Sequence, residues 1–306
     1  MLCDASSAAL LQWLKGSEPQ VRLEVANSVW LRNTFQFKPR YVKELERNYG
    51  AKATIFDFND PKSLDVINQW VKERTQGKIL TAGPAALNPL DRLVLINAVY
   101  FKGAWEKKFD PSKTLEQPFH LGNGKTKALP FMKRTARLGY QEAKGFQSVR
   151  IPYGEKQTMA FWVFLPKEGV TLLQLHEQLQ TSGRGAFDSG AADVTLELPR
   201  FKLQFDAELT PVLQALGMKR AFTRSAEFGG MSLPGSEELM ITKVHHKTFV
   251  EVNEEGTEAA ATTTVVATAK SAEMKVTFRV DRPFFCAIVD DKTGSILFMG
   301  SIVDPQ

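Results

Sequence analysis

The chain has 306 residues, of which 43% are hydrophobic and 24% are charged, a composition typical of soluble globular proteins. No stretch approaches the about 20 apolar residues that span a bilayer, so we expect no membrane segment. The net charge of +5 is small and spread along the chain, which argues against a nucleic-acid partner. The two cysteines, Cys3 and Cys286, predict no disulfide framework.

The first third of the chain predicts helices alternating with strands. The best-formed helix opens at Asp60, a candidate N-cap followed by proline, and Gly77 ends it. The run 92–101 is nearly all apolar, which favours a strand buried on both faces in the middle of a large sheet. Helices are expected at 5–15, 39–49 and 60–76, and strands at 21–31, 53–58 and 92–101.

The remainder of the chain is dominated by strand signals. Turn residues at 122–124 and 291–294 predict hairpins, and only two short helical patterns interrupt the strands. Helices are expected at 172–179 and 209–216, and strands within 119–165 and at 194–205, 240–252, 276–278, 284–289 and 296–299. Helices early and strands late, without a flexible linker, predict an α+β fold with mostly antiparallel sheets in a single domain over 1–306.

One stretch, 254–271, fits neither an ordinary loop nor an ordinary strand. It contains one glycine and no proline, and it is rich in alanine and β-branched residues. Read with a period of two, one of its faces is small and uncharged, and would suit insertion between strands that already have neighbours. That face consists of Thr257, Ala259, Ala261, Thr263, Val265, Ala267 and Ala269. An edge strand or a disordered tether is the simpler alternative.

Signals of enzyme chemistry are poor. The four histidines form no metal-binding spacing, and adjacent His245 and His246 point to opposite faces of a predicted strand. No nucleophile elbow or phosphate-binding loop occurs. We therefore expect no catalytic residues, no metal and no cofactor. His246 and Asn97 are polar groups on predicted central strands, where they are expected to be buried and could bond each other. Bonds to backbone or water are the alternative.

Several motifs together resemble the serpin family over essentially the whole chain. They are Leu95-Ile96-Asn97-Ala98-Val99-Tyr100-Phe101-Lys102-Gly103-Ala104-Trp105, Thr75-Gln76-Gly77-Lys78-Ile79, Leu198-Pro199-Arg200-Phe201, Glu254-Glu255-Gly256-Thr257-Glu258-Ala259-Ala260-Ala261 and Pro283-Phe284 with Leu297-Phe298-Met299-Gly300. The resemblance implies a fold of three mostly antiparallel β-sheets with surrounding helices and an exposed reactive loop, here at about 254–275.

The resemblance also implies a function. A serpin is a serine protease inhibitor that traps its target as an acyl-enzyme when the cut loop inserts into the largest sheet. We expect a monomer whose partner is a serine protease, while a non-inhibitory carrier, chaperone or storage serpin and an inactive fragment are alternatives. The hinge residues implied are Glu254, Glu255, Gly256, Thr257, Glu258, Ala259, Ala260 and Ala261. The family spacing places the reactive bond at Lys270–Ser271, with cleavage beside Ala269 or Ala272 as alternatives.

The family pattern assigns roles to several other positions. A lysine before the cut bond suits a trypsin-like protease, whose specificity pocket is acidic. Asn97 and His246 match the shutter beneath the sliding strands, and Trp105 matches the breach where the loop first enters. Thr210 falls where many relatives have a lysine that pairs with the hinge glutamate, so we expect Glu254 to lack that pair.

The resemblance begins near the fourth helix of the family, so we expect an N-terminally truncated serpin domain that lacks the first three helices. Sheet positions normally covered by those helices would then be open on one face. The sequence itself does not identify a compartment. The family favours an extracellular location, with a cytoplasmic one as the alternative.

Overall fold

A computed structural model of the chain describes residues 2–81, 87–233, 238–257 and 275–306. The chain forms two compact units, each assembled from three separate segments. The first unit comprises Met1–Gly16, Leu23–Phe101 and Gln204–Val250, and the second comprises Ser17–Arg22, Lys102–Leu203 and Glu251–Gln306. Because the segments interleave along the sequence, neither unit is a simple sequence domain, and the expectation of a single domain stays a prediction.

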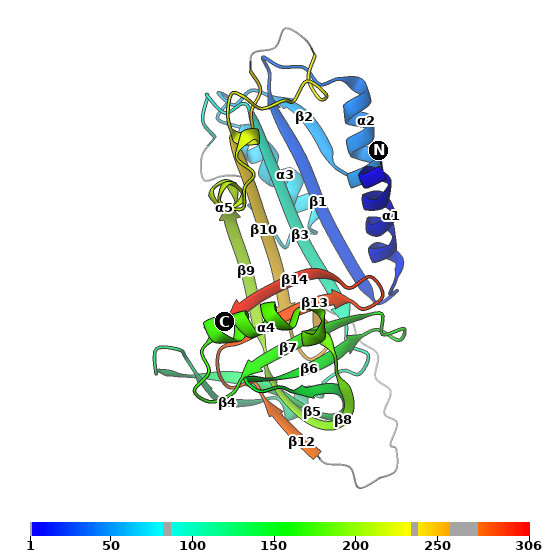
Figure 1. Cartoon of the computed structure of the whole chain (residues 1–306), viewed down its shortest axis with the longest axis vertical. Coiled ribbons are helices and arrows are strands. Elements are labelled where there is room, and N and C mark those ends of the chain that lie inside the picture. The colour runs from blue at the N-terminus through cyan, green and yellow to red at the C-terminus, as the bar shows by residue number, and fades with distance from the viewer. Residues whose placement is uncertain (1, 82–86, 234–237, 258–274) are drawn as a thin grey trace. The chain divides into compact units, whose positions relative to one another are not determined.

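The first of the two sheets is six-stranded and has long central strands, in the order β2-β1-β3-β10-β9 with β11 paired to β3 (Figure 1). Strand β3 pairs with β10 in parallel from Val94–Lys243 to Tyr100–Phe249, so the two strands are direct neighbours over this length. The bounds are Val21–Arg32 for β1, Lys52–Phe56 for β2, Leu93–Ala104 for β3, Phe201–Glu208 for β9, Lys243–Val252 for β10 and Gly256–Thr257 for β11.

The second sheet is eight-stranded, in the order β12-β8-β5-β6-β7-β13-β14 with β4 paired to β5. We expected three sheets, whereas the described strands form two hydrogen-bonded sheets. The reason is that β5 is 17 residues long and pairs with β4 and β8 along most of its length and with β6 at its end. The bounds are Leu115–His120 for β4, Thr126–Glu142 for β5, Phe146–Tyr153 for β6, Met159–Pro166 for β7, Gly190–Pro199 for β8, Lys275–Arg279 for β12, Phe284–Asp290 for β13 and Ser295–Ile302 for β14.

The helices follow the sequence patterns closely, with one difference at a cap. The third helix begins at Ser63 rather than at Asp60, because the Asp60 carboxylate accepts a hydrogen bond from the Lys62 backbone N–H in the preceding turn. The bounds are Leu2–Gly16 for α1, Pro39–Tyr49 for α2, Ser63–Arg74 for α3, Leu172–Ser182 for α4 and Thr210–Ala215 for α5, with 3₁₀ turns η1 at Pro111–Lys113, η2 at Gly183–Phe187 and η3 at Arg220–Phe222.

Helix α3 packs on one face of the six-stranded sheet. Its Trp70 meets Trp30 of β1 edge to face, with ring centroids 6.1 Å apart, in a cluster that also buries Val94 and Ile96 of β3. The prediction that the 92–101 strand is buried on both faces is wrong. Leu95, Asn97 and Val99 are only partly buried, whereas the alternate residues Val94, Ile96 and Ala98 are buried in the α3 cluster.

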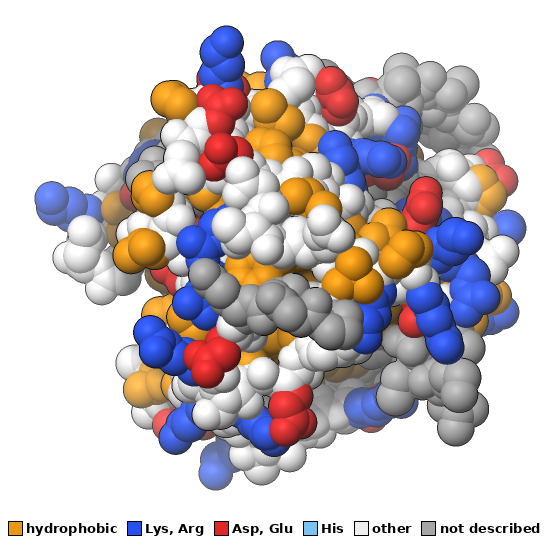
Figure 2. Space-filling view, turned by 90° about the horizontal axis from the view of Figure 1, so that it is seen from above, with side chains coloured by type: hydrophobic (Ala, Val, Ile, Leu, Met, Phe, Trp, Pro, Cys, Tyr) orange, Lys and Arg blue, Asp and Glu red, His pale blue; other side chains and the backbone are white. Residues whose placement is uncertain are grey.

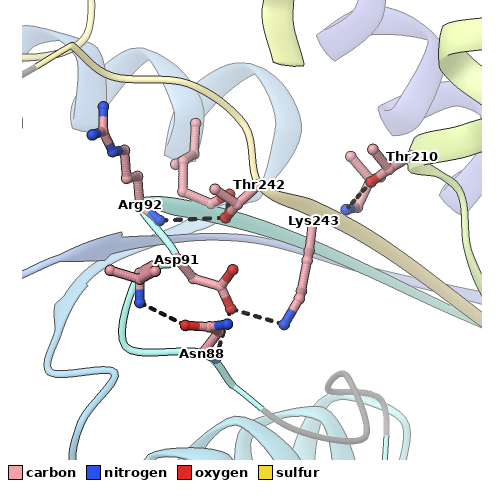
Figure 3. A network of polar contacts seen from close by, with 9 residues as sticks. Asn88, Asp91, Arg92, Thr210, Thr242 and Lys243 are labelled. Atoms are coloured by element: carbon pink, nitrogen blue, oxygen red, sulfur yellow. Dashed lines mark hydrogen bonds and ion pairs between the residues drawn. The ribbon is translucent and has the colours of Figure 1, made fainter. Parts of the chain in front are cut away.

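A polar network ties together the first residues of β3 and β10 in the first unit (Figure 3). The Asp91 carboxylate lies 2.9 Å from the Lys243 ammonium and also accepts the Asn88 backbone N–H. The Thr242 hydroxyl donates to the Leu93 carbonyl and accepts from the Arg92 N–H. These contacts join the two strands where their direct pairing begins.

On the face seen from above, Lys and Arg side chains are interspersed with Asp and Glu side chains and with apolar groups (Figure 2). Within the described ranges, no helix is long and apolar enough to cross a membrane. The expectation that nucleic acid is not a partner stays a prediction.

Candidate functional site: a hinge cluster and a polar sheet cluster

The described part of the hinge is held in place by its own backbone. Asn253 and Gly256 exchange backbone hydrogen bonds of 2.9 and 3.2 Å, and the Asn253 side chain accepts the Glu255 N–H. The turn places Gly256 opposite Ala104 and Thr257 opposite Gly103, antiparallel to β3. A Cβ on Gly256, whose φ is 151°, would lie 2.0 Å from the Gly103 carbonyl oxygen. Only glycine therefore fits this approach to β3.

An aromatic stack supports this turn. The Trp105 ring lies on the Tyr153 ring with centroids 4.7 Å apart and an interplanar angle of 8°. The Trp105 indole N–H donates to the Asn253 carbonyl at 2.9 Å, and its backbone N–H donates to the Glu255 carbonyl. The Tyr153 hydroxyl lies 2.7 Å from the Thr257 hydroxyl oxygen, and both residues are 0% exposed. Burial raises the pKa of Tyr153, which keeps its hydroxyl protonated.

The two hinge glutamates are both paired. The Glu254 carboxylate accepts the Thr114 hydroxyl at 2.6 Å and lies 3.6 Å from the Arg200 guanidinium. The Glu255 carboxylate binds the Lys108 ammonium at 2.9 Å. We call Trp105, Tyr153 and residues 253–257 the hinge cluster; all of them belong to the second unit.

The expectation that position 210 is the one that pairs with the hinge glutamate is wrong. Thr210 lies at the start of α5 in the first unit, where its hydroxyl accepts the Val244 N–H (Figure 3). The partner of Glu254 is instead Arg200, which directly follows β8. Arg200 stands within a motif that carried the family resemblance, so the sequence held a signal for this pair.

The polar sheet cluster consists of Asn27, Asn97 and His246 in the first unit. Asn97 faces His246 in the β3–β10 register, and its side-chain oxygen lies 2.7 Å from His246 Nδ1. The Asn97 amide donates to the Asn27 side-chain oxygen at 2.7 Å, and the Asn27 amide donates to the Tyr49 carbonyl. Since the Asn97 oxygen can only accept, His246 Nδ1 carries a proton.

His245 and His246 are consecutive residues of β10, so their side chains lie on opposite faces of the strand, as predicted. His246 is partly buried rather than buried, and burial lowers its pKa. His245 Nδ1 lies 3.6 Å from an Asp206 carboxylate oxygen, and burial lowers its pKa too, although Asp206 opposes this. The buried Lys247 ammonium binds the same carboxylate at 2.8 Å and the Thr81 hydroxyl at 3.1 Å. No group of three or more potential metal ligands occurs among the described residues.

Some expected site residues lie outside the described residues. They are Glu258, Ala259, Ala260, Ala261, Lys270 and Ser271, which fall within 258–274. The structure brings together Trp105 with residues 254–257, and Asn97 with His246. Sequence reasoning missed Tyr153, Thr114 and Asn27, whose contacts join residues far apart in the chain.

Comparisons with known proteins agree with this geometry. The family model Serpin (serine protease inhibitor) matches residues 3–305. Ipis-1 of Ixodes persulcatus is 37% identical over 95% of this chain and 79% of its own length.

Two solved structures have the same fold. Arabidopsis AtSerpin1 in its native stressed conformation superposes with a TM-score of 0.85 and 29% identity, covering 99% of this chain and 81% of that one. Thyroxine-binding globulin complexed with thyroxine has a TM-score of 0.88 and 23% identity, with 99% and 81% covered, and shows the fold alone. The chain belongs to the serpin family of serine protease inhibitors.

Proposed function

We propose that this chain inhibits trypsin-like serine proteases as a suicide substrate. The protease serine attacks the Lys270 carbonyl carbon, the Lys270–Ser271 bond breaks, and the Ser271 amine takes a proton and leaves. The Lys270 acyl group remains as an ester on the protease serine. Lysine before the cut bond fits an acidic specificity pocket.

The observation that carries this proposal is the register of β11. Gly256 and Thr257 already pair with Ala104 and Gly103, antiparallel to β3. Each further loop residue in that register would face the preceding residue of β3. Residue 260 would then face Tyr100, and residue 266 would face Val94. This is the length of β3 that β10 now occupies.

The loop has the length and the side chains for that position. Residues 257–270 span about 46 Å when extended, at about 3.3 Å per residue. In the β11 register residue 270 would face position 90, three residues before β3 begins at Leu93. Cleavage would therefore move the acylated lysine along the whole of β3. Insertion would replace the β3–β10 contact with two new strand contacts, because the loop would pair on both edges.

The test is incubation with trypsin followed by denaturing electrophoresis. We expect a covalent complex that survives denaturation, and a released peptide that begins at Ser271 by mass spectrometry. Lys270→Ala is the matched control and should abolish the complex with trypsin. A peptide beginning elsewhere would refute the reactive bond.

A second variant isolates insertion from cleavage. Thr257→Arg places a charge at a fully buried position and should leave cleavage intact while preventing the complex. Cleaved wild type should melt at a much higher temperature than the intact chain, whereas the cleaved variant should not. Cleavage of wild type without a complex and without this increase would instead support a non-inhibitory serpin or an inactive fragment.

A further inference from the structure

The contact between Tyr153 and Thr257 is not required for the acylation step. Tyr153 ends β6, and its hydroxyl reaches the hinge from 104 residues away in the chain, at 2.7 Å. The proposed acylation is at Lys270, 13 residues further along the chain than Thr257. The contact must therefore be explained by what it does to Thr257.

The Tyr153 ring has little freedom to move. Its face lies on the Trp105 ring at 4.7 Å, and the backbones of the two residues form an isolated antiparallel bridge. Trp105 is in turn hydrogen-bonded to the Asn253 carbonyl. The phenol is thus held by the same turn that carries the hinge, and its hydroxyl can satisfy the buried Thr257 hydroxyl without reorganisation.

The contact fixes the side chain of Thr257, the second described residue of β11. Two described residues of this strand, Gly256 and Thr257, pair with β3. Glycine contributes no side-chain contact, so of these two residues Thr257 alone anchors β11 through its side chain. Insertion in the existing register leaves Thr257 opposite Gly103, which means that the Tyr153 contact need not break as the loop inserts.

We propose that Tyr153 is a positioning residue that holds Thr257 in register with β3, so that a cut loop inserts from a fixed starting point. The inference rests on the proposed function, in which insertion competes with deacylation of the protease. A starting point that is already ordered shortens the time to insertion and raises the fraction of protease that is trapped. Loss of the contact should therefore divert the chain from inhibitor to substrate.

The test uses Tyr153→Phe, Thr257→Val and the double variant, with Thr257→Ser as the matched control that keeps the hydroxyl. The readout is the ratio of covalent complex to cleaved, released chain with trypsin, together with the rate of cleavage at Lys270–Ser271. We expect each hydroxyl deletion to lower that ratio about two- to tenfold, as for the loss of one buried hydrogen bond, without changing the cleavage rate. The double variant should be no worse than the poorer single one, and Thr257→Ser should stay near wild type.

Three outcomes would overturn the inference. One is an unchanged ratio in both single variants, one is an additive double variant, and one is a Thr257→Ser ratio as low as that of Thr257→Val. Tyr153→Phe keeps the ring and its stack on Trp105, so its urea midpoint serves as the check on folding. If wild type forms no complex at all, the proposed function fails and this inference with it. A wild-type complex with an unchanged ratio in the variants refutes the inference alone.

Discussion

Arg134 of β5 is buried in the second unit, where its guanidinium lies over an aromatic ring. The residue is 7% exposed, and none of its three guanidinium nitrogens forms a hydrogen bond with the described residues. Its guanidinium carbon lies 4.6 Å from the centroid of the Phe109 ring. Burial lowers the pKa of Arg134 to about 10, although the charge of Glu106 opposes this.

The size of this pKa shift determines how much the free energy of unfolding should rise when the charge of Arg134 is removed. A pKa lowered from 12.5 to about 10 corresponds to about 3 kcal/mol against the charged form, at about 1.36 kcal/mol per pKa unit. The cation–π contact with Phe109 offsets about 1–2 kcal/mol of this. Arg134→Met retains an unbranched side chain of similar reach, so we expect the free energy of unfolding to rise by about 1–2 kcal/mol.

Urea denaturation followed by tryptophan fluorescence measures this change. Arg134→Lys is the matched control, because it keeps a buried cation and should bring no gain. A urea midpoint for Arg134→Met at or below that of wild type would refute the reasoning. It would mean that the guanidinium stabilises the native chain through its packing on Phe109 by more than its desolvation costs.

Three further predictions concern the polar sheet cluster, the hinge glutamate and the buried cysteine of β13. Because burial lowers the pKa of His246, its contribution to stability should be fully present above pH 6.5 and be lost as the pH falls through the lower pKa of the native state. His246→Gln should therefore reduce the fall of the urea midpoint with pH. Glu254→Ala leaves the Thr114 hydroxyl without its acceptor and should cost about 1–2 kcal/mol of unfolding free energy, whereas Arg200→Ala should cost less than about 1 kcal/mol because that guanidinium is half-exposed. Burial raises the pKa of the Cys286 thiol to about 12. In a variant with the other cysteine replaced by serine, the native chain should therefore resist a thiol reagent at pH 8 and react once it is unfolded. Rapid labelling of the native chain would contradict this.

Local patterns predicted most of the secondary structure because they depend on neighbours in the chain. Helix α2 has the predicted bounds Pro39–Tyr49, since a proline at its start and a left-handed glycine after its end are local signals. The C-terminal hairpin of β13 and β14 follows from two apolar runs and a glycine turn. The cap at Asp60 was misplaced because an aspartate can serve a turn as well as a helix start.

The candidate site was predicted in part. Family motifs singled out Trp105, Asn97, His246 and residues 254–257, and the bond between Asn97 and His246, a stated possibility, is present in the structure. Partners contributed by other strands were not predicted. Thr114 meets Glu254 across 140 residues, and no periodicity or spacing encodes such a contact.

The sequence by itself determined that 254–271 has the composition of a strand, and that its alternate positions are small. This follows from the chemistry of successive residues, which a two-residue period exposes directly. Only the tertiary structure decided that the strand already begins at Gly256, in register with β3, and that Tyr153 and Arg200 meet its first residues. The reason is physical: strand pairing and buried hydrogen bonds depend on which distant segments come together, and that choice is made by the packing of the whole unit.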